Sequence, residues 1–351
     1  MSVYDCFRLW VVLIIACGQF SYGSAHTSYN LYCIGNSLTW GAKPGLLEYP
    51  FSSLGYALEV DYHIACGKSL KYILSDPEFT CVDSLSGDTW IERLSSEAIE
   101  FDAVVFQPHL GASLAEELSA ISRMIAIATE GGRNLGTNYY ILYTWPRNLE
   151  DLPADALWLQ ALDLDASEGE AMKNTLAHFD YLLSEIRRLH PDTSIHAVPV
   201  GSVLYALAEQ LKIEDEGASA SIADIYADSI HLKWASGEFI SHLVLAATLL
   251  RSEPSELSFY STWKNAIDIN LLSLAEEVTA SVLDNSFRTD IEFPPRIQLL
   301  RDKLYFRGQL YQSENLMDWS PVDSVVSPMC LKSLIGTPYS KCLFYRVEPD
   351  A

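Results

Sequence analysis

The chain has 351 residues, of which 49% are hydrophobic, so it can bury a sizeable core and is expected to form one large domain with a smaller part. Its 46 acidic residues outnumber 23 basic ones and give a formal net charge of −23 at pH 7. This charge repels the phosphates of nucleic acid and an anionic membrane surface, so neither is an expected partner. The acidic residues are spread along the chain, which is typical of a solvated surface.

The first 25 residues have the pattern of a secretory signal peptide. Arg8 precedes an apolar run from Leu9 to Phe20, and a stretch of small residues ends at Ala25, where cleavage is expected. The run is too short to span a bilayer, so we expect no transmembrane segment and a secreted or periplasmic protein. Two alternatives remain: a buried or interfacial N-terminal segment, and a lipoprotein anchored at Cys17.

Short apolar runs then alternate with helical patterns. The runs predict five buried strands, at Asn30 to Ile34, Leu58 to Ala65, Ala103 to Gln107, Tyr139 to Thr144 and Ile195 to Val200. Ser113 to Thr129 and Ala166 to Leu189 have apolar residues at three- and four-residue spacing, which predicts helices. This alternation indicates a parallel sheet with helices on both faces, a three-layer α/β/α, flavodoxin-like arrangement. In such sheets the functional site lies beyond the carboxyl ends of the strands.

The pattern of polar and apolar residues changes at Glu292. Phe293-Pro294-Pro295 indicates a linker, and the remainder alternates polar and apolar residues, which predicts a small all-β module over residues 291–351 after a main domain over residues 26–290. The stretch from Tyr311 to Trp319, with the terminal Phe344-Tyr345-Arg346-Val347, resembles a β-sandwich-like appendage found at the ends of exported proteins of planctomycete-type bacteria.

Five cysteines remain after the predicted signal segment, an odd number for an oxidising compartment: Cys33, Cys66, Cys81, Cys330 and Cys342. One thiol must therefore stay reduced or pair outside the chain. Cys330 and Cys342 bracket a short loop before a terminal strand and are the predicted disulfide. Cys33 and Cys66 each end an apolar run, so we interpret them as small buried hydrophobes. No CxxC or HExxH spacing occurs, so the sequence supports no metal site, and no cofactor is expected.

The first predicted strand leads directly into Gly35-Asn36-Ser37-Leu38-Thr39, a turn that would expose a serine hydroxyl at the strand's carboxyl end. Ser37 is therefore a candidate nucleophile. A serine hydroxyl needs a base and a carboxylate that orients the base, and Asp228-Ser229-Ile230-His231 supplies both. The turn lacks the glycine that the GxSxG elbow requires two residues after the serine, which indicates a different serine-hydrolase fold.

Together these two motifs resemble the first and last blocks of the SGNH hydrolase (GDSL-like esterase) superfamily, in particular its exported subfamily with a GNSLT opening. The resemblance covers roughly residues 30 to 255. It implies that Ser37 is the nucleophile, His231 the base and Asp228 the orienting carboxylate. It also implies an oxyanion hole made by the N–H groups of Ser37 and Gly67. The family's third donor is an asparagine, and this chain has Gln107 there, whose amide can donate in the same way.

The resemblance implies an exported esterase that works through an acyl-enzyme without a cofactor, with carbohydrate O-acetyl groups as the implied substrate, in a small molecule or a polysaccharide. Three alternatives stay open at this point. A lipase or thioesterase of the same fold would need a wide apolar cleft. Acyl transfer to a sugar would need water to be excluded. A non-catalytic, carbohydrate-binding surface protein would account for the altered third block at Gln107.

Overall fold

The computed structural model describes residues 27–109, 112–150, 152–160, 162, 174–214 and 225–287, together with short strands between residues 296 and 348. The chain divides into two compact units, Met1–Asp284 and Asn285–Ala351. The predicted signal segment, with Cys17 and the cleavage point near Ala25, lies outside the described residues. None of the described helices combines the length and the apolar character that a membrane crossing requires.

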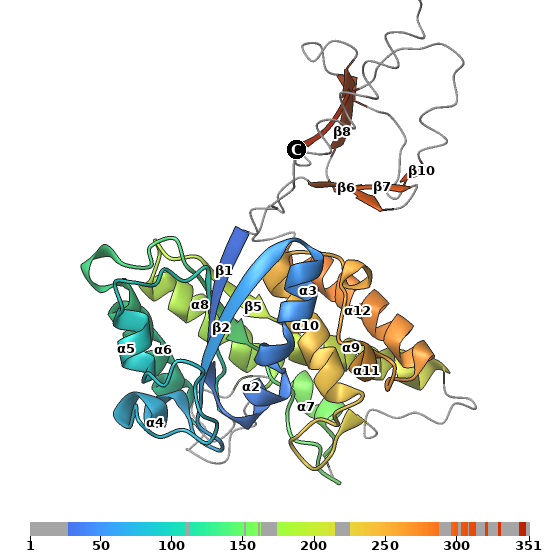
Figure 1. Ribbon diagram of the computed structural model, residues 1–351. Coiled ribbons are helices and arrows are strands. Elements are labelled where there is room, and N and C mark those ends of the chain that lie inside the picture. Colours follow the sequence, from blue (N-terminus) through green and yellow to red (C-terminus); the bar gives the residue numbers. More distant parts are fainter. Residues whose placement is uncertain are drawn as a thin grey trace, which may run out of the picture. The chain divides into compact units, whose positions relative to one another are not determined.

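Five parallel strands form the centre of the first unit, in the order β2-β1-β3-β4-β5 (Figure 1). They are β1 (Thr27–Gly35), β2 (Tyr56–Ile64), β3 (Ala103–Phe106), β4 (Asn138–Leu142) and β5 (Ile195–Val198). Parallel neighbours need a crossover connection, and helices lie between each consecutive pair. This strand order is that of flavodoxin-like sheets. The predicted parallel sheet is confirmed, with strand ends that differ from the expected ones by a few residues.

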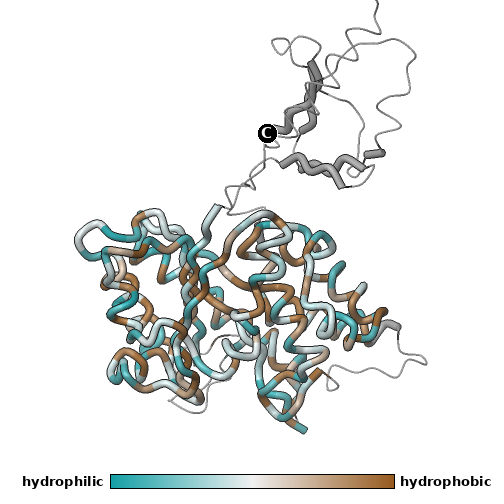
Figure 2. The backbone as a smooth tube through the Cα atoms, in the orientation of Figure 1, coloured by the Kyte–Doolittle hydropathy of each residue, from teal (hydrophilic) through white to brown (hydrophobic). Residues whose placement is uncertain are grey.

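The sheet is buried most deeply at its centre and along the carboxyl halves of its first two strands. All of β3 is buried, and in β4 only Asn138 is not fully buried. In β1 and β2 the first residues are exposed in part, while the last four or five are buried. Continuous burial of this kind is expected where a parallel sheet is covered on both faces. Hydrophobic residues accordingly concentrate along the central strands (Figure 2).

Helices cover both faces of the sheet and form two groups (Figure 1). In one group α6 packs against its neighbours α4, α5 and α8, and in the other α10 packs against α2, α3 and α9. The helices are α2 (Ser37–Gly41), α3 (Glu48–Ser53), α4 (Leu70–Ser75), α5 (Trp90–Ser95), α6 (Leu114–Thr129), α7 (Ala154–Trp158), α8 (Leu176–Leu189), α9 (Val200–Glu214), α10 (Gly237–Leu250), α11 (Ser261–Lys264) and α12 (Ile269–Phe287), with 3₁₀ turns η1 (Pro44–Leu46), η2 (Glu130–Gly132) and η4 (Pro254–Glu256). The three-layer α/β/α architecture predicted from the sequence is therefore present.

The predicted start is correct for one of the two predicted helices and wrong for the other. Helix α6 begins after Ser113, whose side chain forms a capping box with Glu116, in agreement with the predicted start. Helix α8 begins at Leu176, so the predicted start at Ala166 is wrong. Asn174 has a left-handed backbone (φ 63°), and the hydroxyl of Thr175 caps the helix by accepting from the N–H of residue 178. Residues 163–173 lie outside the described residues.

The described residues of the second unit form two three-stranded antiparallel sheets, in the orders β10-β7-β6 and β11-β8-β9. The strands are β6 (Arg296–Leu300), β7 (Lys303–Arg307), β8 (Gln309–Ser313), β9 (Ser320–Pro321), β10 (Met329–Cys330) and β11 (Phe344–Glu348). The resemblance of this module to an exported appendage stays a prediction. Cys342 lies outside the described residues, so its predicted pairing with Cys330 is not tested.

The cysteines of the first unit correct one expectation. Cys66 forms a disulfide with Cys81, so its interpretation as a buried hydrophobe is wrong. The apolar run of β2 ends at Ile64, and the chain then turns outward, which leaves Cys66 exposed. Cys33, in the middle of the sheet, is fully buried and reduced as predicted, and burial raises the pKa of its thiol far above the ordinary value.

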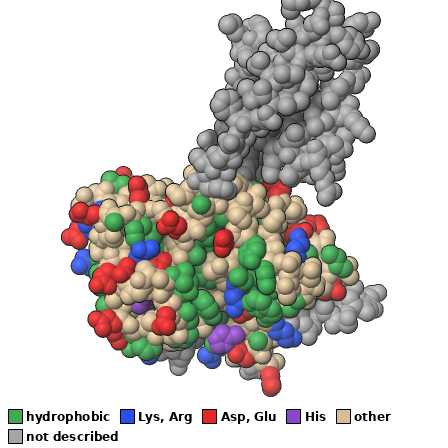
Figure 3. Space-filling model, in the orientation of Figure 1, with side chains coloured by type: hydrophobic (Ala, Val, Ile, Leu, Met, Phe, Trp, Pro, Cys, Tyr) green, Lys and Arg blue, Asp and Glu red, His purple; other side chains and the backbone are tan. Residues whose placement is uncertain are grey.

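Acidic side chains are scattered over the face of the first unit drawn in Figure 3 and do not form a single patch. This distribution agrees with the interpretation of the negative charge as a solvated surface.

Candidate active site

Ser37 lies at the carboxyl edge of the sheet, as the first residue of α2 directly after β1. Asn36 caps this short helix, because its Oδ1 accepts from the N–H of Leu38 at 3.1 Å. The residue before it must be small: a Cβ on Gly35 would lie 2.8 Å from the Cβ of Gln107 and would overlap the side chain of Thr39. The turn sits between β1 and β3, where the strand order reverses and where sites of such sheets form.

Asp228 and His231 lie on a loop whose two ends are held together. Tyr226 and Leu232 pair as an antiparallel bridge, and the N–H of Ala227 donates to the carbonyl of His231 at 2.8 Å. Because both functional side chains come from one closed loop, their relative position is fixed locally.

The structure brings the three residues predicted from the sequence into one hydrogen-bonded chain. His231 Nε2 lies 3.0 Å from the hydroxyl oxygen of Ser37, and His231 Nδ1 lies 2.7 Å from Asp228 Oδ2. A ring nitrogen that faces a carboxylate carries the proton, so Nδ1 donates to Asp228 and Nε2 is left to accept from Ser37. The arrangement can therefore remove a proton from the serine hydroxyl.

Asp228 is held as a carboxylate by its own loop. Its Oδ1 accepts from the N–H groups of His231 and Ile230, both at 2.8 Å. These two N–H groups lower the pKa of Asp228 to about 2, and that of His231 has the larger effect. The side chains of His231 and Asp228 are 41% and 55% exposed, so the chain of contacts is open to solvent and to a large substrate.

A pocket of about 470 Å³, counted with its open mouth, lies against Ser37 and His231. Its other walls are Leu38, Gly41, Leu142, Thr144, Trp145, Val200, Ile230, Leu232, Glu238 and Ser241. The walls are mostly apolar, and Glu238 is the carboxylate among them. Such walls suit a small apolar group of a ligand.

The two predicted backbone donors are the N–H of Ser37, in the serine turn, and the N–H of Gly67, in the loop after β2. Among the described residues, no group accepts from the N–H of Ser37 or from that of Gly67, which has a left-handed backbone (φ 67°). The side chain of Asn36 donates to the carbonyl of Lys68 at 3.3 Å and so ties the Gly67 loop to the serine turn. The geometry leaves both predicted backbone donors available to a ligand.

The Gly67 loop, residues 65–68, is fixed on its outer side by the disulfide between Cys66 and Cys81. The N–H of Cys81 donates to the carbonyl of Ile64 at 2.8 Å, and Ile64 also pairs with Val82 in an antiparallel bridge. The cross-link thus joins the loop to a segment that runs along the end of β2.

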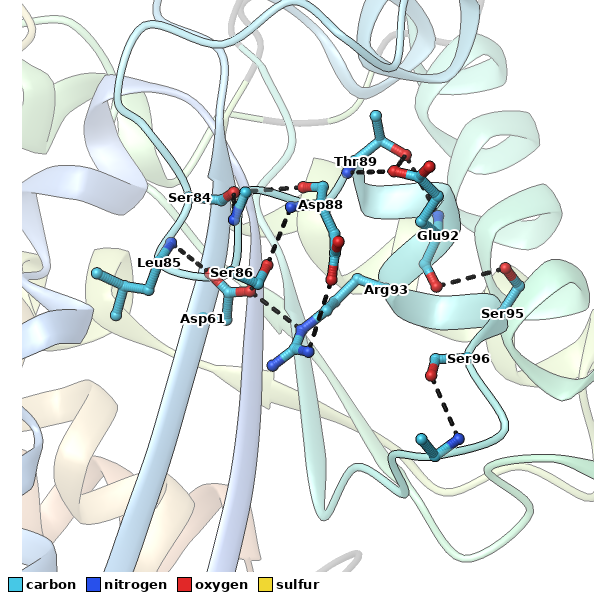
Figure 4. Close-up of polar contacts among 12 residues, drawn as sticks. Asp61, Ser84, Leu85, Ser86, Asp88, Thr89, Glu92, Arg93, Ser95 and Ser96 are labelled. Carbon is cyan, nitrogen blue, oxygen red and sulfur yellow. Dashed lines mark hydrogen bonds and ion pairs between the residues drawn. The ribbon is translucent and has the colours of Figure 1, made fainter.

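A buried carboxylate holds the continuation of that segment (Figure 4). Asp61 of β2 accepts from the N–H of Leu85 at 2.9 Å and from the hydroxyl of Ser86 at 2.5 Å, and it lies 3.0 Å from Nε of Arg93 in α5. Only 3% of the Asp61 side chain is exposed, so screening by water is weak and the ion pair is a fixed part of the structure. Neither this network nor the disulfide was predicted.

Comparison with protein-family models and with curated proteins finds no match for this chain. Among solved structures, it is similar to a DUF4886 family protein from Bacteroides uniformis, with a TM-score of 0.53 and 14% identity over 73% of this chain and 95% of that one. At this identity the likeness shows the fold.

Two further structures are more distant. A member of the lipolytic protein G-D-S-L family from Veillonella parvula has a TM-score of 0.35 and 11% identity over 64% of this chain and 97% of that one. The periplasmic domain of a lipopolysaccharide acetyltransferase from Salmonella ser. Paratyphi A has a TM-score of 0.34 and 12% identity over 66% and 84%. Likenesses of this size carry no argument about activity.

Gln107 follows β3, as predicted, but its side chain is fully buried beneath the serine turn. Its Oε1 accepts from the N–H of Asn36 at 3.3 Å and from the hydroxyl of Thr39 at 3.4 Å, and its Nε2 donates to the carbonyl of Pro108. The N–H of Asn36 can only donate, which fixes which end of the amide faces it. In this position Gln107 supports the turn before Ser37, and its role as an oxyanion donor stays a prediction.

Proposed function

We propose that the protein is a serine esterase of the SGNH type that hydrolyses a carboxylic ester through an acyl-enzyme on Ser37. The observation that carries this proposal is the continuous contact from Ser37 through His231 to Asp228, at 3.0 and 2.7 Å, in which Ser37 and His231 are 194 positions apart in the chain. A serine, a histidine and a carboxylate in this order of contact are the parts that nucleophilic catalysis requires.

The chemistry follows from these contacts. His231 Nε2 takes the proton of the Ser37 hydroxyl as its oxygen attacks the ester carbonyl, and Asp228 stabilises the resulting imidazolium. The tetrahedral intermediate then expels the alcohol, which receives the proton from His231, and the acyl group stays on Ser37. In the second half, His231 takes a proton from water as the water oxygen attacks the acyl carbonyl. The second tetrahedral intermediate breaks its bond to the Ser37 oxygen, which receives the proton back from His231, and the acid leaves.

The proposed oxyanion donors are the N–H groups of Ser37 and Gly67. Preorganised backbone donors are effective because they do not have to reorganise as charge develops on the oxygen. Gln107 would join them only if its amide turned away from Pro108, which its contacts with Asn36 and Thr39 oppose.

We place the enzyme outside the cytoplasm and its substrate among O-acetylated carbohydrates. The predicted signal segment and the Cys66–Cys81 disulfide support export, since disulfides persist in oxidising compartments. The solvent-open site supports a substrate that extends beyond the acyl group.

Replacement of the nucleophile tests the proposal. Ser37→Ala should lower kcat for p-nitrophenyl acetate by at least about 10³-fold, because the attacking atom is lost. Its melting temperature should stay close to that of the unsubstituted protein, and a serine-reactive phosphonate should label Ser37 in the latter. Retention of activity in Ser37→Ala, or labelling of another serine, would refute the assignment. An inactive unsubstituted protein would favour the non-catalytic, carbohydrate-binding alternative.

A second activity is favoured by one observation: the apolar pocket wall formed by Leu38, Leu142 and Val200. Such a wall could accept a longer acyl chain, as in a lipase or thioesterase. p-Nitrophenyl esters of graded chain length distinguish the two, since an acetyl esterase should lose kcat/KM steadily as the chain lengthens.

A further inference from the structure

Two exposed tryptophans lie close in the chain to the proposed nucleophile and base. Trp40 follows Ser37 by three residues and is 36% exposed, and Trp234 follows His231 by three residues and is 48% exposed. Each ring is therefore carried by the same short segment as a member of the proposed triad. Large aromatic surface left in water beside a pocket indicates a binding surface, because a ligand that covers it gains apolar burial.

Both rings are held in place before any ligand binds. Trp234 stacks on the buried Trp263 with ring centres 4.7 Å apart, and the indole N–H of Trp263 donates to the carbonyl of Trp234 at 2.5 Å. Trp40 contacts Tyr62 of β2 edge to face, with ring centres 5.4 Å apart. Rings fixed in this way lose little conformational freedom when a ligand is added, which favours affinity.

An ion pair joins the two rings to the pocket. Lys43 Nζ lies 6.0 Å from the ring centre of Trp40 and 5.2 Å from that of Trp234, and 3.0 Å from Oε1 of Glu238. Glu238 is itself part of the pocket wall. We call Trp40, Lys43, Trp234 and Glu238 the indole site. Figure 3 shows hydrophobic side chains gathered over α2 and beside α10, with a lysine or arginine between them.

The chemistry of the indole site selects among possible ligands. The charges of Lys43 and Glu238 compensate each other, so the site does not favour an anion, and the net charge of −23 opposes one further. The ammonium and carboxylate can donate to and accept from hydroxyl groups. Exposed aliphatic side chains, which would suit a lipid, lie on other segments: Leu85, Leu135, Leu159, Leu189 and Ile269.

We propose that the indole site binds the sugar ring of an acylated neutral carbohydrate, on the alcohol side of the ester bond that Ser37 attacks. A pyranose ring presents a face of C–H groups to an indole and a rim of hydroxyls to the ion pair, so it matches both parts of the site. The acyl group then enters the apolar pocket. This inference rests on the proposed function and adds the residues that hold the sugar of the substrate.

The test compares two substrates in single variants. The two substrates are an acetylated neutral xylo-oligosaccharide and p-nitrophenyl acetate. Trp234→Ala and Trp40→Ala should each lower kcat/KM for the oligosaccharide about tenfold more than kcat/KM for p-nitrophenyl acetate, as expected for one lost aromatic contact. The loss should come mainly from a higher KM. Tyr181→Ala is the matched control, because Tyr181 is also 36% exposed but lies on α8, and its ratio should not change. Melting temperatures identify a variant that fails to fold, and the variant of the other tryptophan then tests the proposal.

Each result separates this inference from the function on which it rests. Equal losses on both substrates, or no loss on either, would show that the tryptophans bind no sugar. A selective loss on p-nitrophenyl octanoate would identify an acyl-chain surface instead. Hydrolysis of p-nitrophenyl acetate without hydrolysis of the acetylated oligosaccharide would refute the sugar while the esterase stands. Full activity in Ser37→Ala would refute the esterase mechanism itself.

Discussion

The turn that carries Ser37 lies between two segments that are held by different means. On one side, the Gly67 loop is exposed and is fixed by the Cys66–Cys81 disulfide and by polar contacts. On the other side, the Asp228–His231 loop lies next to α10, which is almost entirely buried from Gly237 to Leu249. A Cβ on Gly237 would lie 2.6 Å from the carbonyl oxygen of Ile225, so the glycine lets the loop pack directly against the helix.

This difference indicates that the two sides of one candidate site are held in two different ways. A loop that leaves the sheet at an exposed turn has little apolar surface to bury, so a covalent bond and hydrogen bonds hold it. The Asp228–His231 loop is held by its own backbone hydrogen bonds and by packing where its ends meet a buried helix. We therefore expect each side to respond to a different perturbation, which can be tested one side at a time.

The largest effect is expected on the packed side, at Asp228. Asp228→Asn should lower kcat for p-nitrophenyl acetate by about 10²–10⁴-fold, because an amide cannot hold the imidazole in the tautomer that accepts from Ser37. Ser229→Ala, in the same exposed loop, is the control and should retain activity. Since the pKa of Asp228 is about 2, protonation of Asp228 should cause no loss of activity above about pH 4. A loss of kcat above pH 4 that is caused by protonation of Asp228 would contradict its role as the orienting carboxylate.

Gln107, beneath the turn itself, should have the next largest effect. Its contacts predict that Gln107→Ala lowers kcat about tenfold and the melting temperature by roughly 3–8 °C, because the buried N–H of Asn36 loses its acceptor. As an oxyanion donor, Gln107 would instead give a loss of about 10²–10³-fold in kcat with unchanged stability. Steady-state kinetics and thermal unfolding of the same preparation distinguish these outcomes.

The cross-linked side should respond to reductant. Replacing both Cys66 and Cys81 by Ser should lower kcat about fivefold with little change in KM, because the N–H of Gly67 is loosened but not removed. Loss of a cross-link over 15 residues should also lower the free energy of unfolding by about 3 kcal/mol. Dithiothreitol should reproduce the loss of kcat in the unsubstituted protein and leave the kcat of the variant unchanged. Equal sensitivity of both proteins to the reductant would contradict this prediction.

The smallest expected effect is a loss of stability at acidic pH, caused by His242 on the packed side. His242 of α10 is buried and faces the carbonyl of Ala42 at 2.9 Å, and burial lowers the pKa of His242 to about 4 from 6.5. The unfolded chain therefore takes up the proton first as pH falls, so this contribution to stability is complete above about pH 6.5 and is lost progressively toward pH 4.

At pH 5.5 the expected loss of stability from His242 is about 1 kcal/mol. Thermal unfolding between pH 7 and 5 measures it, and His242→Asn should show a shallower dependence on pH than the unsubstituted protein. Identical pH dependence in the two proteins would show that His242 does not contribute.

The sequence predicted those parts of the molecule that depend on local patterns. Five apolar runs separated by helical patterns were enough to predict the parallel sheet, and the sheet in turn placed the segments after the strands at one edge. The contact between Ser37 and His231 could be expected for this reason, although 194 positions separate them.

The remaining features depend on how the chain turns after an element ends. Cys66 follows a buried strand, and only the outward turn at the next residue exposes it and brings it to Cys81. The odd number of cysteines indicated that at least one has no partner within the chain, but spacing did not indicate that Cys66 pairs with Cys81. Likewise, Trp40 and Trp234 are visible in the sequence, whereas the lysine that lies between their rings is a property of the folded chain.

The segment that runs along β2 also bears on how the molecule behaves in a concentrated solution. Strand β2 is at one edge of the sheet, and an unpaired edge invites a strand of another molecule to add to it. Near the end of β2, Val82 already occupies that position opposite Ile64, and the disulfide and Asp61 keep it there. The bond that steadies the Gly67 loop therefore also keeps a strand of another molecule from pairing with this end of the edge.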